Sequence, residues 1–284
     1  MADPIVRAAA DADMPGLRAV ADHYGLLGTW PERPDFVDAE REFGAVLVGE
    51  VDGTIAGFGG ALRRGTVTHL GDLFVLPDHQ SSGLGRAILS RLLPRDTPRV
   101  TFASDDKRAF ALYVRNGMRP RCPLLYLTRG PLGGRPASRG SGPAAPGENG
   151  PGENGPGEAE VRAAAAMDAH VSGGDRSATL TWYAGLPGVT LHVSGPGYAF
   201  ARVTGDTVVI GPAGGATPQD CADIVLEAAN ARPGAARVHL AVPGTHPLLP
   251  LLLEAGWRIG DMDTLMTSED FMRLDCYIPH PDLG

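Results

Sequence analysis

One segment of the sequence combines glycines, a glutamine and a proline in a way that suits the binding of a phosphate group. It runs Val-Leu-Pro-Asp-His-Gln-Ser-Ser-Gly-Leu-Gly-Arg from Val75 to Arg86. An apolar stretch typical of a buried strand precedes it, and an expected helix follows, whose first backbone N–H groups have no partner within the helix. Gly83 and Gly85 leave those groups open to a phosphate, and Arg86 adds positive charge. The segment therefore predicts a pyrophosphate-binding loop.

Two common phosphate-binding motifs fit this loop poorly. A P-loop needs Gly-Lys followed by Ser or Thr, which the sequence lacks. The dinucleotide fingerprint needs three spaced glycines directly after the strand. Only Gly83 and Gly85 are present here, eight or more residues beyond Val75. A different cofactor chemistry is indicated.

The loop resembles motif A of the GNAT acetyltransferase superfamily, in which a strand ending in Val-x-Pro is followed by Gln/Arg-x-x-Gly-x-Gly/Ala. Gln80, Gly83 and Gly85 match that pattern position by position. The resemblance implies that acetyl-CoA is the acyl donor, with no metal involved. Its pyrophosphate would be held by Gln80, Ser81, Ser82, Gly83, Leu84, Gly85 and Arg86. Backbone groups of Leu73, Phe74 and Val75 would hold the pantetheine arm as an added strand.

A second segment, residues 109–118 with the sequence AFALYVRNGM, resembles motif B of the same family. By that resemblance, Tyr113 protonates the departing CoA thiolate. The alternative is a tyrosine that only packs on the sheet, with its hydroxyl hydrogen-bonded elsewhere.

Acetyl transfer to an amine also requires that a proton be removed, because an alkyl ammonium has a pKa of about 10.4. Asp72, near the centre of the expected sheet, is the candidate base, although neighbouring backbone could instead satisfy its carboxylate. His69 is a second candidate. The asparagine that the family often carries after the next strand is replaced by Ser104 and Asp106.

The acceptor would be contacted by residues 25–42. Within this range, the acidic Glu32, Asp35 and Asp38, near Trp30, would favour a cationic amine. A solvated acidic loop is the alternative interpretation.

The elements expected around these motifs alternate between helix and strand. A helix capped by Asp13 is followed by strands over residues 45–51, 55–62 and 66–75, a helix over 83–93, a strand over 100–103, a helix over 107–115 and a closing strand over 124–128. Residues 159–277 repeat this rhythm, with strands over 191–193, 198–203, 208–212 and 238–242, a helix capped by Thr217 and a helix ending at Ala255.

Between the two halves, residues 130–158 have almost no large apolar side chains and contain PGENG-PGENG-PGE. Such a composition predicts a flexible linker. The expected fold class is α/β, with two tandem GNAT-like mixed-sheet domains: a GNAT domain over 1–129, the linker over 130–158, a degenerate copy over 159–277 and a tail over 278–284. The copy lacks the Gln-x-x-Gly-x-Gly loop, and Pro218 and Asp220 disfavour phosphate there, so CoA is not expected to bind it.

The net charge, the cysteine spacing and the lack of long apolar stretches bear on the partners and location to be expected. The formal net charge of −8 disfavours nucleic acid or an anionic membrane as a partner. Cys122, Cys221 and Cys276 form no CxxC pair and are expected to be scattered thiols. No apolar stretch suits a signal peptide or a membrane span, which favours the cytoplasm. The oligomeric state is left open.

The function predicted from these features is N-acetylation of an amine of a small molecule or peptide. A non-catalytic acyl-CoA-binding module that regulates a partner is the alternative. Inactivation of an antibiotic or toxin would be a subtype of the same chemistry.

Overall fold

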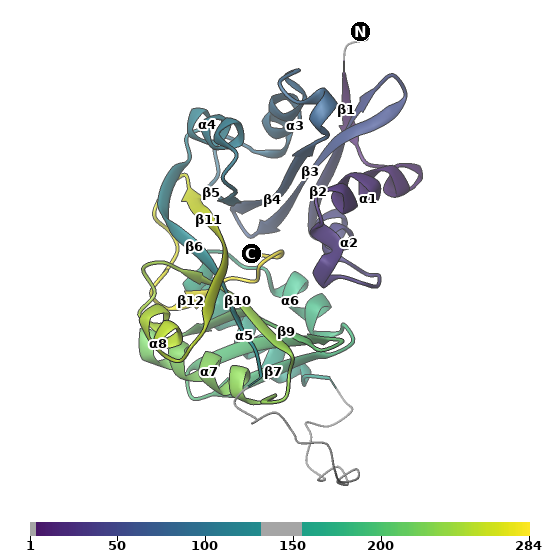
Figure 1. Ribbon diagram of the computed structural model, residues 1–284. Helices are drawn as coiled ribbons and strands as arrows, with labels where there is room; N and C mark the ends of the chain where they lie inside the picture. The colour runs from purple at the N-terminus through teal and green to yellow at the C-terminus, as the bar shows by residue number, and fades with distance from the viewer. Residues whose placement is uncertain (1–3, 132–154) are drawn as a thin grey trace, which may run out of the picture.

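The computed structural model describes residues 4–131 and 155–284, and its strands form a single 12-stranded mixed sheet with helices on both faces (Figure 1). The segment 132–154, with most of the predicted linker, lies outside the described residues. In the first half the elements are β1 (Ile5–Ala8), α1 (Met14–His23), α2 (Phe36–Phe43), β2 (Gly44–Val51), β3 (Thr54–Arg64), β4 (Val67–Val75), α3 (Leu84–Leu92), β5 (Arg99–Ala103), α4 (Lys107–Arg115) and β6 (Arg119–Arg129), with 3-10 turns η1 (Asp11–Asp13), η2 (Leu26–Thr29) and η3 (Pro77–His79).

The second half repeats the succession of a helical pair, a meander and strand–helix units. Its elements are α5 (Glu158–Ser172), α6 (Ser177–Ala184), β7 (Val189–Ser194), β8 (Gly197–Thr204), β9 (Thr207–Gly215), α7 (Pro218–Asn230), β10 (Arg237–Pro243), α8 (Leu248–Glu254), β11 (Arg258–Thr267) and β12 (Tyr277–Ile278).

Most of the predicted elements are present, and one local prediction was wrong. Asp13 precedes α1 but does not cap it: its carboxylate accepts the N–H of Ala10 and pairs with Arg7. The helix α5 begins at Glu158, the last residue of the predicted linker. Thr217 does cap α7, where it accepts the N–H of Asp220.

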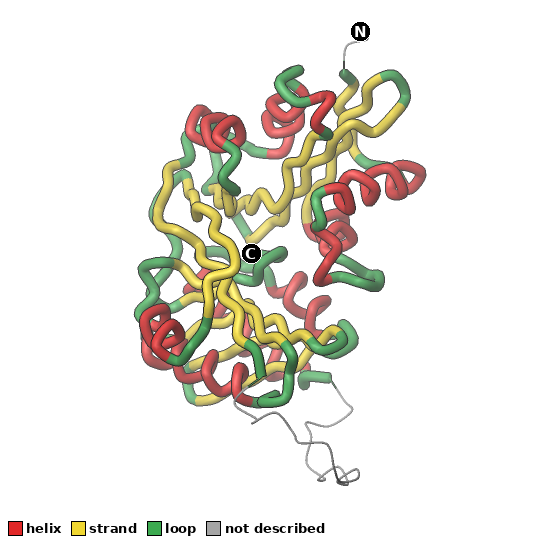
Figure 2. Tube along the Cα trace, in the orientation of Figure 1, coloured by secondary structure: helices red, strands yellow, loops and turns green. Residues whose placement is uncertain are grey.

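The two halves exchange their last strands. The order of the sheet is β1-β2-β3-β4-β5-β11-β6-β10-β9-β8-β7, so β11 of the second half lies antiparallel between β5 and β6 of the first (Figure 2). In turn, β6 pairs with β10 of the second half. The expectation that residues 124–128 close the first domain was therefore wrong, because β6 leaves that half and β11 takes the place beside β5.

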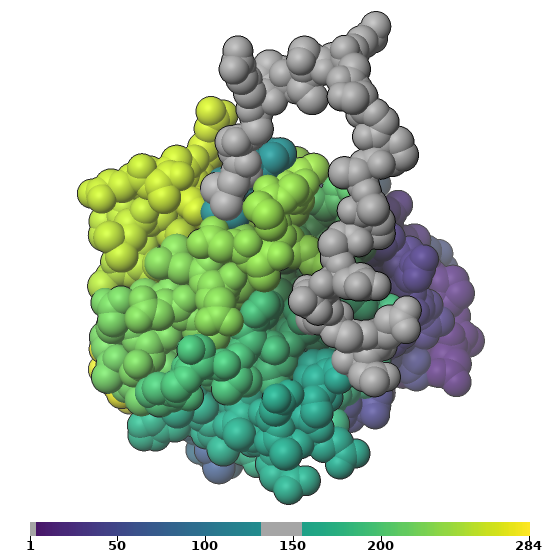
Figure 3. All heavy atoms as spheres, turned by 90° about the horizontal axis from the view of Figure 1, so that it is seen from below, coloured from purple at the N-terminus to yellow at the C-terminus, as the bar shows by residue number. Residues whose placement is uncertain are grey.

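The halves also share a hydrophobic core. One cluster of buried side chains joins α1 and α2 of the first half to α5 and α6 of the second. Trp30 stacks on Trp182 with ring centroids 6.4 Å apart, and Phe43 meets the same ring edge-on. Seen from below, the second half forms most of the visible face and the first half borders it (Figure 3). Side chains of the second half thus form part of the hydrophobic core of the first half.

A buried ion pair anchors the chain near β12. Asp168 on α5 receives two hydrogen bonds from the Arg176 guanidinium, at 2.7 and 2.8 Å, and one from the hydroxyl of Tyr198. Arg176 also contacts the hydroxyl of Tyr277 on β12. Neither charged side chain is more than 2% exposed. Among the described residues, no helix is both long and apolar enough to cross a membrane.

Candidate functional site

A large cavity among the described residues lies where β4 and β5 separate. These parallel strands pair only over Thr68–Leu70 and Arg99–Thr101. Gly71 is left unpaired by a bulge against β3, and bulges increase the local twist of a strand. Beyond it, the β4 edge from Gly71 to Val75 has no strand partner on the β5 side. The cavity has a volume of about 760 Å³, and Leu73, Phe74 and Val75 are among the residues that line it.

One end of the cavity is formed by the predicted phosphate loop. Ser81, with φ of 63°, and Gly83, with φ of 92°, turn the chain sharply into α3. Such angles favour glycine. Ser82 Oγ accepts the N–H of Leu84, while the next N–H groups of α3 have no intrahelical partner. Gly85 and Arg86 carry those groups and line the cavity, which makes this end suited to an anion.

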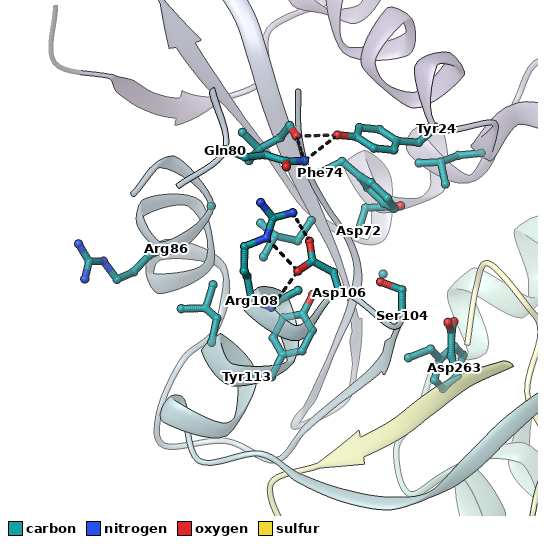
Figure 4. A pocket seen from close by; sticks show the side chains of 18 of the residues that line it. Tyr24, Asp72, Phe74, Gln80, Arg86, Ser104, Asp106, Arg108, Tyr113 and Asp263 are labelled. Atoms are coloured by element: carbon teal, nitrogen blue, oxygen red, sulfur yellow. Dashed lines mark hydrogen bonds and ion pairs between the residues drawn. The ribbon is translucent and has the colours of Figure 1, made fainter. Parts of the chain in front are cut away.

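Two residues of the predicted loop have other roles. The Leu84 side chain is fully buried in the core under β2 and β3 and does not line the cavity. The Gln80 amide donates to the carbonyl oxygen of Val75 at 3.0 Å and to the Tyr24 hydroxyl at 3.2 Å. Tyr24 in turn donates to the same carbonyl at 2.6 Å. Gln80 therefore fixes the end of β4 and the start of the loop (Figure 4).

Asp72 points from β4 into the cavity, and a second carboxyl group, on Glu40 of α2, lies behind it. Glu40 packs on the glycines of the bulge: a methyl group added at Gly60 would lie 1.7 Å from its Oε2, and one at Gly71 2.5 Å from its Oε1. Because it is buried and faces the charge of Asp72, Glu40 has a pKa well above its usual range. It therefore keeps its proton at neutral pH, although neither of its carboxyl oxygens has a hydrogen-bond partner among the described residues.

The pKa of Asp72 is raised to about 7. Burial is the main cause, the neighbouring Glu40 carboxyl lowers the pKa, and the charges of Asp282 and Asp35 raise it further. A carboxyl group that titrates near neutral pH can both accept and release a proton under physiological conditions. The pair is thus suited to general base chemistry.

Tyr113 projects from α4 into the same cavity (Figure 4). Its pKa is raised first by burial and then by the charges of Asp72, Asp106 and Asp263, so it keeps its proton at neutral pH. Asp106 caps α4 and forms an ion pair with Arg108 at 2.7 Å. Asp106 and Ser104, at the position of the family's asparagine, both line the cavity.

His69 is a cavity residue but a poor base. Both of its ring nitrogens are buried without a hydrogen-bond partner. Its pKa lies well below the usual value because of burial and then the positive charges of Arg64 and Arg176. The ring is therefore neutral, and it contacts Phe102 with centroids 5.0 Å apart.

The far end of the cavity is built partly by the second half of the chain. Asp263 on β11 and Asp282 in the tail both line it, beside Tyr126 of β6. Tyr126 donates to Asp263 Oδ2 at 2.7 Å. Asp282 Oδ2 accepts from Trp30 Nε1 at 2.9 Å and from Thr29 at 3.2 Å. Residues 278–284, predicted as a plain tail, thus reach the site.

The acidic residues expected to contact an acceptor lie elsewhere. Asp35 caps α2 and pairs with Arg18 at 2.8 Å, and Asp38 pairs with both Arg33 and Arg18. These carboxylates pair with arginines and do not line the cavity. From residues 25–42, the side chains that line the cavity are those of Leu26 and Phe36.

The equivalent cleft of the second half is filled by the chain itself. There β9 pairs with β10 only over Thr207–Ile210 and then diverges, as β4 does from β5. In the gap, β12 pairs antiparallel with Ala213 and Gly214 of β9. An internal strand therefore occupies the position that is open in the first half.

Sequence reasoning missed Glu40, Tyr24, Tyr126, Asp263 and Asp282. Their sequence neighbourhoods carry no motif, and the last two reach the cavity only through the strand exchange and the tail. The alternation of polar and apolar residues in Arg258–Thr267 was the one available sign of β11.

Comparisons with known proteins agree with this geometry. Residues 16–118 match the acetyltransferase (GNAT) family, and a search of curated protein sequences gives no match. The structure is similar to that of a proposed acetyltransferase from Pyrococcus horikoshii, with a TM-score of 0.71 and 19% identity over 99% of this chain and 96% of that one.

Two further structures cover both halves. A GCN5-related N-acetyltransferase from Sphaerobacter thermophilus has a TM-score of 0.56 at 17% identity, over 93% of this chain and 95% of that one. A tandem GNAT protein from the clavulanic acid biosynthesis pathway has a TM-score of 0.55 at 16% identity, over 93% and 98%. At such identities the likeness shows the fold alone. The predicted class, a mixed α/β fold of two GNAT-like halves in tandem, is confirmed.

Proposed function

We propose that this chain, whose residues 16–118 carry a GNAT acetyltransferase domain, transfers an acetyl group from acetyl-CoA to an amine of a small molecule or peptide. The observation that carries the proposal is the open edge of β4, which leads directly to the unpartnered N–H groups of α3. A strand edge and an anion site in line suit a pantetheine arm followed by a pyrophosphate.

In this proposal the β4 edge binds the donor, which supplies a thioester carbonyl for the amine nitrogen to attack. Asp72 accepts one proton from the ammonium group, and the neutral amine then attacks the thioester carbonyl to form the carbon–nitrogen bond. As the carbon–sulfur bond breaks, Tyr113 gives its proton to the departing thiolate, and the second proton lost by the nitrogen passes through solvent to restore the Tyr113 hydroxyl. Glu40 stays protonated beside Asp72, so that only Asp72 of this buried pair ionises near neutral pH.

The second half would bind no CoA. The strand β12 already occupies its cleft. In addition, Thr217 caps the first turn of α7, and that turn carries the carboxylate of Asp220. We expect one acetyl-CoA per chain, because the first half offers the one open groove of this kind among the described residues.

Two measurements test the proposal on the full chain. Calorimetric titration should give a stoichiometry near one, and replacing both Gly83 and Gly85 by valine should abolish binding, since side chains would block the N–H groups and strain the turn at Gly83. Gly234→Val, at a loop position with no neighbouring atom within 4 Å, is the matched control.

The second measurement is release of free CoA thiol with a panel of amines. Turnover supports the enzyme, whereas binding of acetyl-CoA without thiol release from any amine would indicate the regulatory binding module instead. Unchanged acetyl-CoA affinity in the double glycine variant would refute the assignment of the loop.

A further inference from the structure

Charge is distributed unevenly along the cavity. Apart from the neutral His69, its basic side chains come from η3, α3 and α4, around the phosphate loop: His79, Arg86, Arg108 and Arg115. The opposite end carries acidic side chains from three separate elements: Asp72 on β4, Asp263 on β11 and Asp282 in the tail. A donor with phosphates suits the first end, and the acidic end is left for the acceptor.

Among the described residues, Asp263 has no cationic partner. Its Oδ2 accepts a hydrogen bond from the neutral Tyr126 hydroxyl, and no donor contacts its Oδ1. Asp282 is held by the neutral donors Trp30 and Thr29. The positive charge of Arg202 lowers the pKa of Asp282. This guanidinium stacks on the Trp30 ring, 4.3 Å from its centroid, and does not line the cavity.

These carboxyl groups lie within electrostatic range of one another. The charges of Asp263 and Asp282 both raise the pKa of Tyr126, and the charge of Asp282 also raises that of Asp72. Burial raises the pKa of Asp263 and of Asp282 as well. Burial and mutual repulsion make the ionised form of these carboxyl groups unfavourable, and a bound cation lowers that electrostatic cost.

An independent observation points to a ligand at this end. His69 is 1% exposed, faces the cavity and leaves both ring nitrogens unpartnered. Unsatisfied buried polar groups are uncommon in folded proteins, and a bound molecule that completes the missing hydrogen bonds is one explanation for such a group. The neutral ring is compatible with a cationic neighbour, which a protonated histidine would repel.

From this arrangement we infer that the acceptor carries two positive charges: its reacting amine lies against Asp72, and its second, distal cation is bound by Asp263, with Asp282 beside it. The inference rests on the proposed function and names the acceptor class, an aliphatic compound with a second amine or guanidine group. Asp263 acts in specificity and takes no part in proton transfer.

The test compares acceptors that differ only in distal charge. Rates of CoA thiol release are measured with 1,4-diaminobutane, butylamine and 4-aminobutanoate, and with 1,6-diaminohexane and hexylamine. We expect kcat/KM for a diamine to exceed that of its monoamine by about 10- to 100-fold, the range of a hydrogen bond to a charged group. The acceptor with a distal carboxylate should be the poorest.

Asp263→Asn should reduce the diamine advantage to less than about threefold, mainly by raising KM for the diamine. Asp261→Asn, an exposed position two residues earlier on β11 that does not line the cavity, removes one charge from the same strand and should leave the preference intact.

The outcomes separate the two proposals. Equal rates for diamines and monoamines, or a preference that survives in Asp263→Asn, would overturn the dicationic acceptor and leave the acetyltransferase standing. No thiol release with any acceptor, although acetyl-CoA binds, would overturn the acetyltransferase and the inference with it.

Discussion

Replacing Asp72 by asparagine should change the form of the pH–rate profile as well as the rate. If ionised Asp72 takes the proton of a bound ammonium group, wild-type kcat/KM should rise with pH up to about 7, the pKa of Asp72, and then level off. Without this base the amine must lose its proton beforehand. The variant should therefore show no break near pH 7, and its rate should keep rising toward pH 10.

The size of the effect follows from the amine. With a pKa of about 10.4, roughly one acceptor molecule in a thousand or fewer is neutral at pH 7. The variant should lose about 10³-fold in kcat/KM at pH 7, and the loss should shrink steadily at higher pH. Asp78→Asn, at an exposed position on η3, is the control and should keep the wild-type profile.

Although Asp72→Asn should lower the rate, it should raise the free energy of unfolding at neutral and higher pH. The folded-state pKa of Asp72 is raised from 3.8 to about 7, so ionisation of this group costs stability as pH rises through that window. Above pH 7 the full cost is about 4 kcal/mol, and below pH 4 it vanishes. In urea titrations, Asp72→Asn should be more stable than wild type at pH 8 and equal to it near pH 4. A variant that retains the break at pH 7 would refute the assignment of Asp72 as the base.

Three further substitutions test other parts of the structure. Tyr113→Phe should lower kcat by about 10²- to 10⁴-fold without changing the calorimetric affinity for acetyl-CoA; an unchanged kcat would leave Tyr113 as a packing residue. Gly60→Ala should destabilise the fold by about 1–3 kcal/mol in urea, because the added methyl group would lie 1.7 Å from Oε2 of Glu40; wild-type stability would mean that Glu40 can move aside. Asp168→Asn should cost about 3–5 kcal/mol, since it leaves Arg176 buried without its counter-charge; a loss under 1 kcal/mol in the same titration would argue against the pair as an anchor.

The local structure of this chain could be predicted where short-range signals determine it. The turn at Asp52-Gly53, the Thr217 cap and the loop before α3 each depend on neighbouring residues, and the structure agrees there. The proposed donor side of the candidate site lies in one such stretch, from Leu73 to Arg86, so residue types and spacing were enough to predict a strand, a glycine turn and a helix there.

The acceptor side could not be predicted, because it depends on contacts between distant segments. Asp263 and Tyr126 meet through pairing of β11 with β6, and the residues are 137 positions apart. The hydrogen bond from Trp30 to Asp282 spans 252 positions. No local pattern encodes such neighbours. The acids at Asp35 and Asp38 suggested a site by composition, yet helix capping and nearby arginines account for both.

The exchange of β6 and β11 has a consequence for the biosynthesis of this protein. The strand that completes the first half ends at Thr267, 138 residues after β6 ends at Arg129. At about 5–20 residues per second, a ribosome needs roughly 7 to 28 seconds to make that stretch. During this interval β5 has an unpaired edge, and unpaired edges invite pairing with other chains. The nascent first half is thus most exposed to misassembly and to chaperones before β11 emerges, so a translational pause after Arg129 should lower the yield of folded protein more than a pause after Thr267.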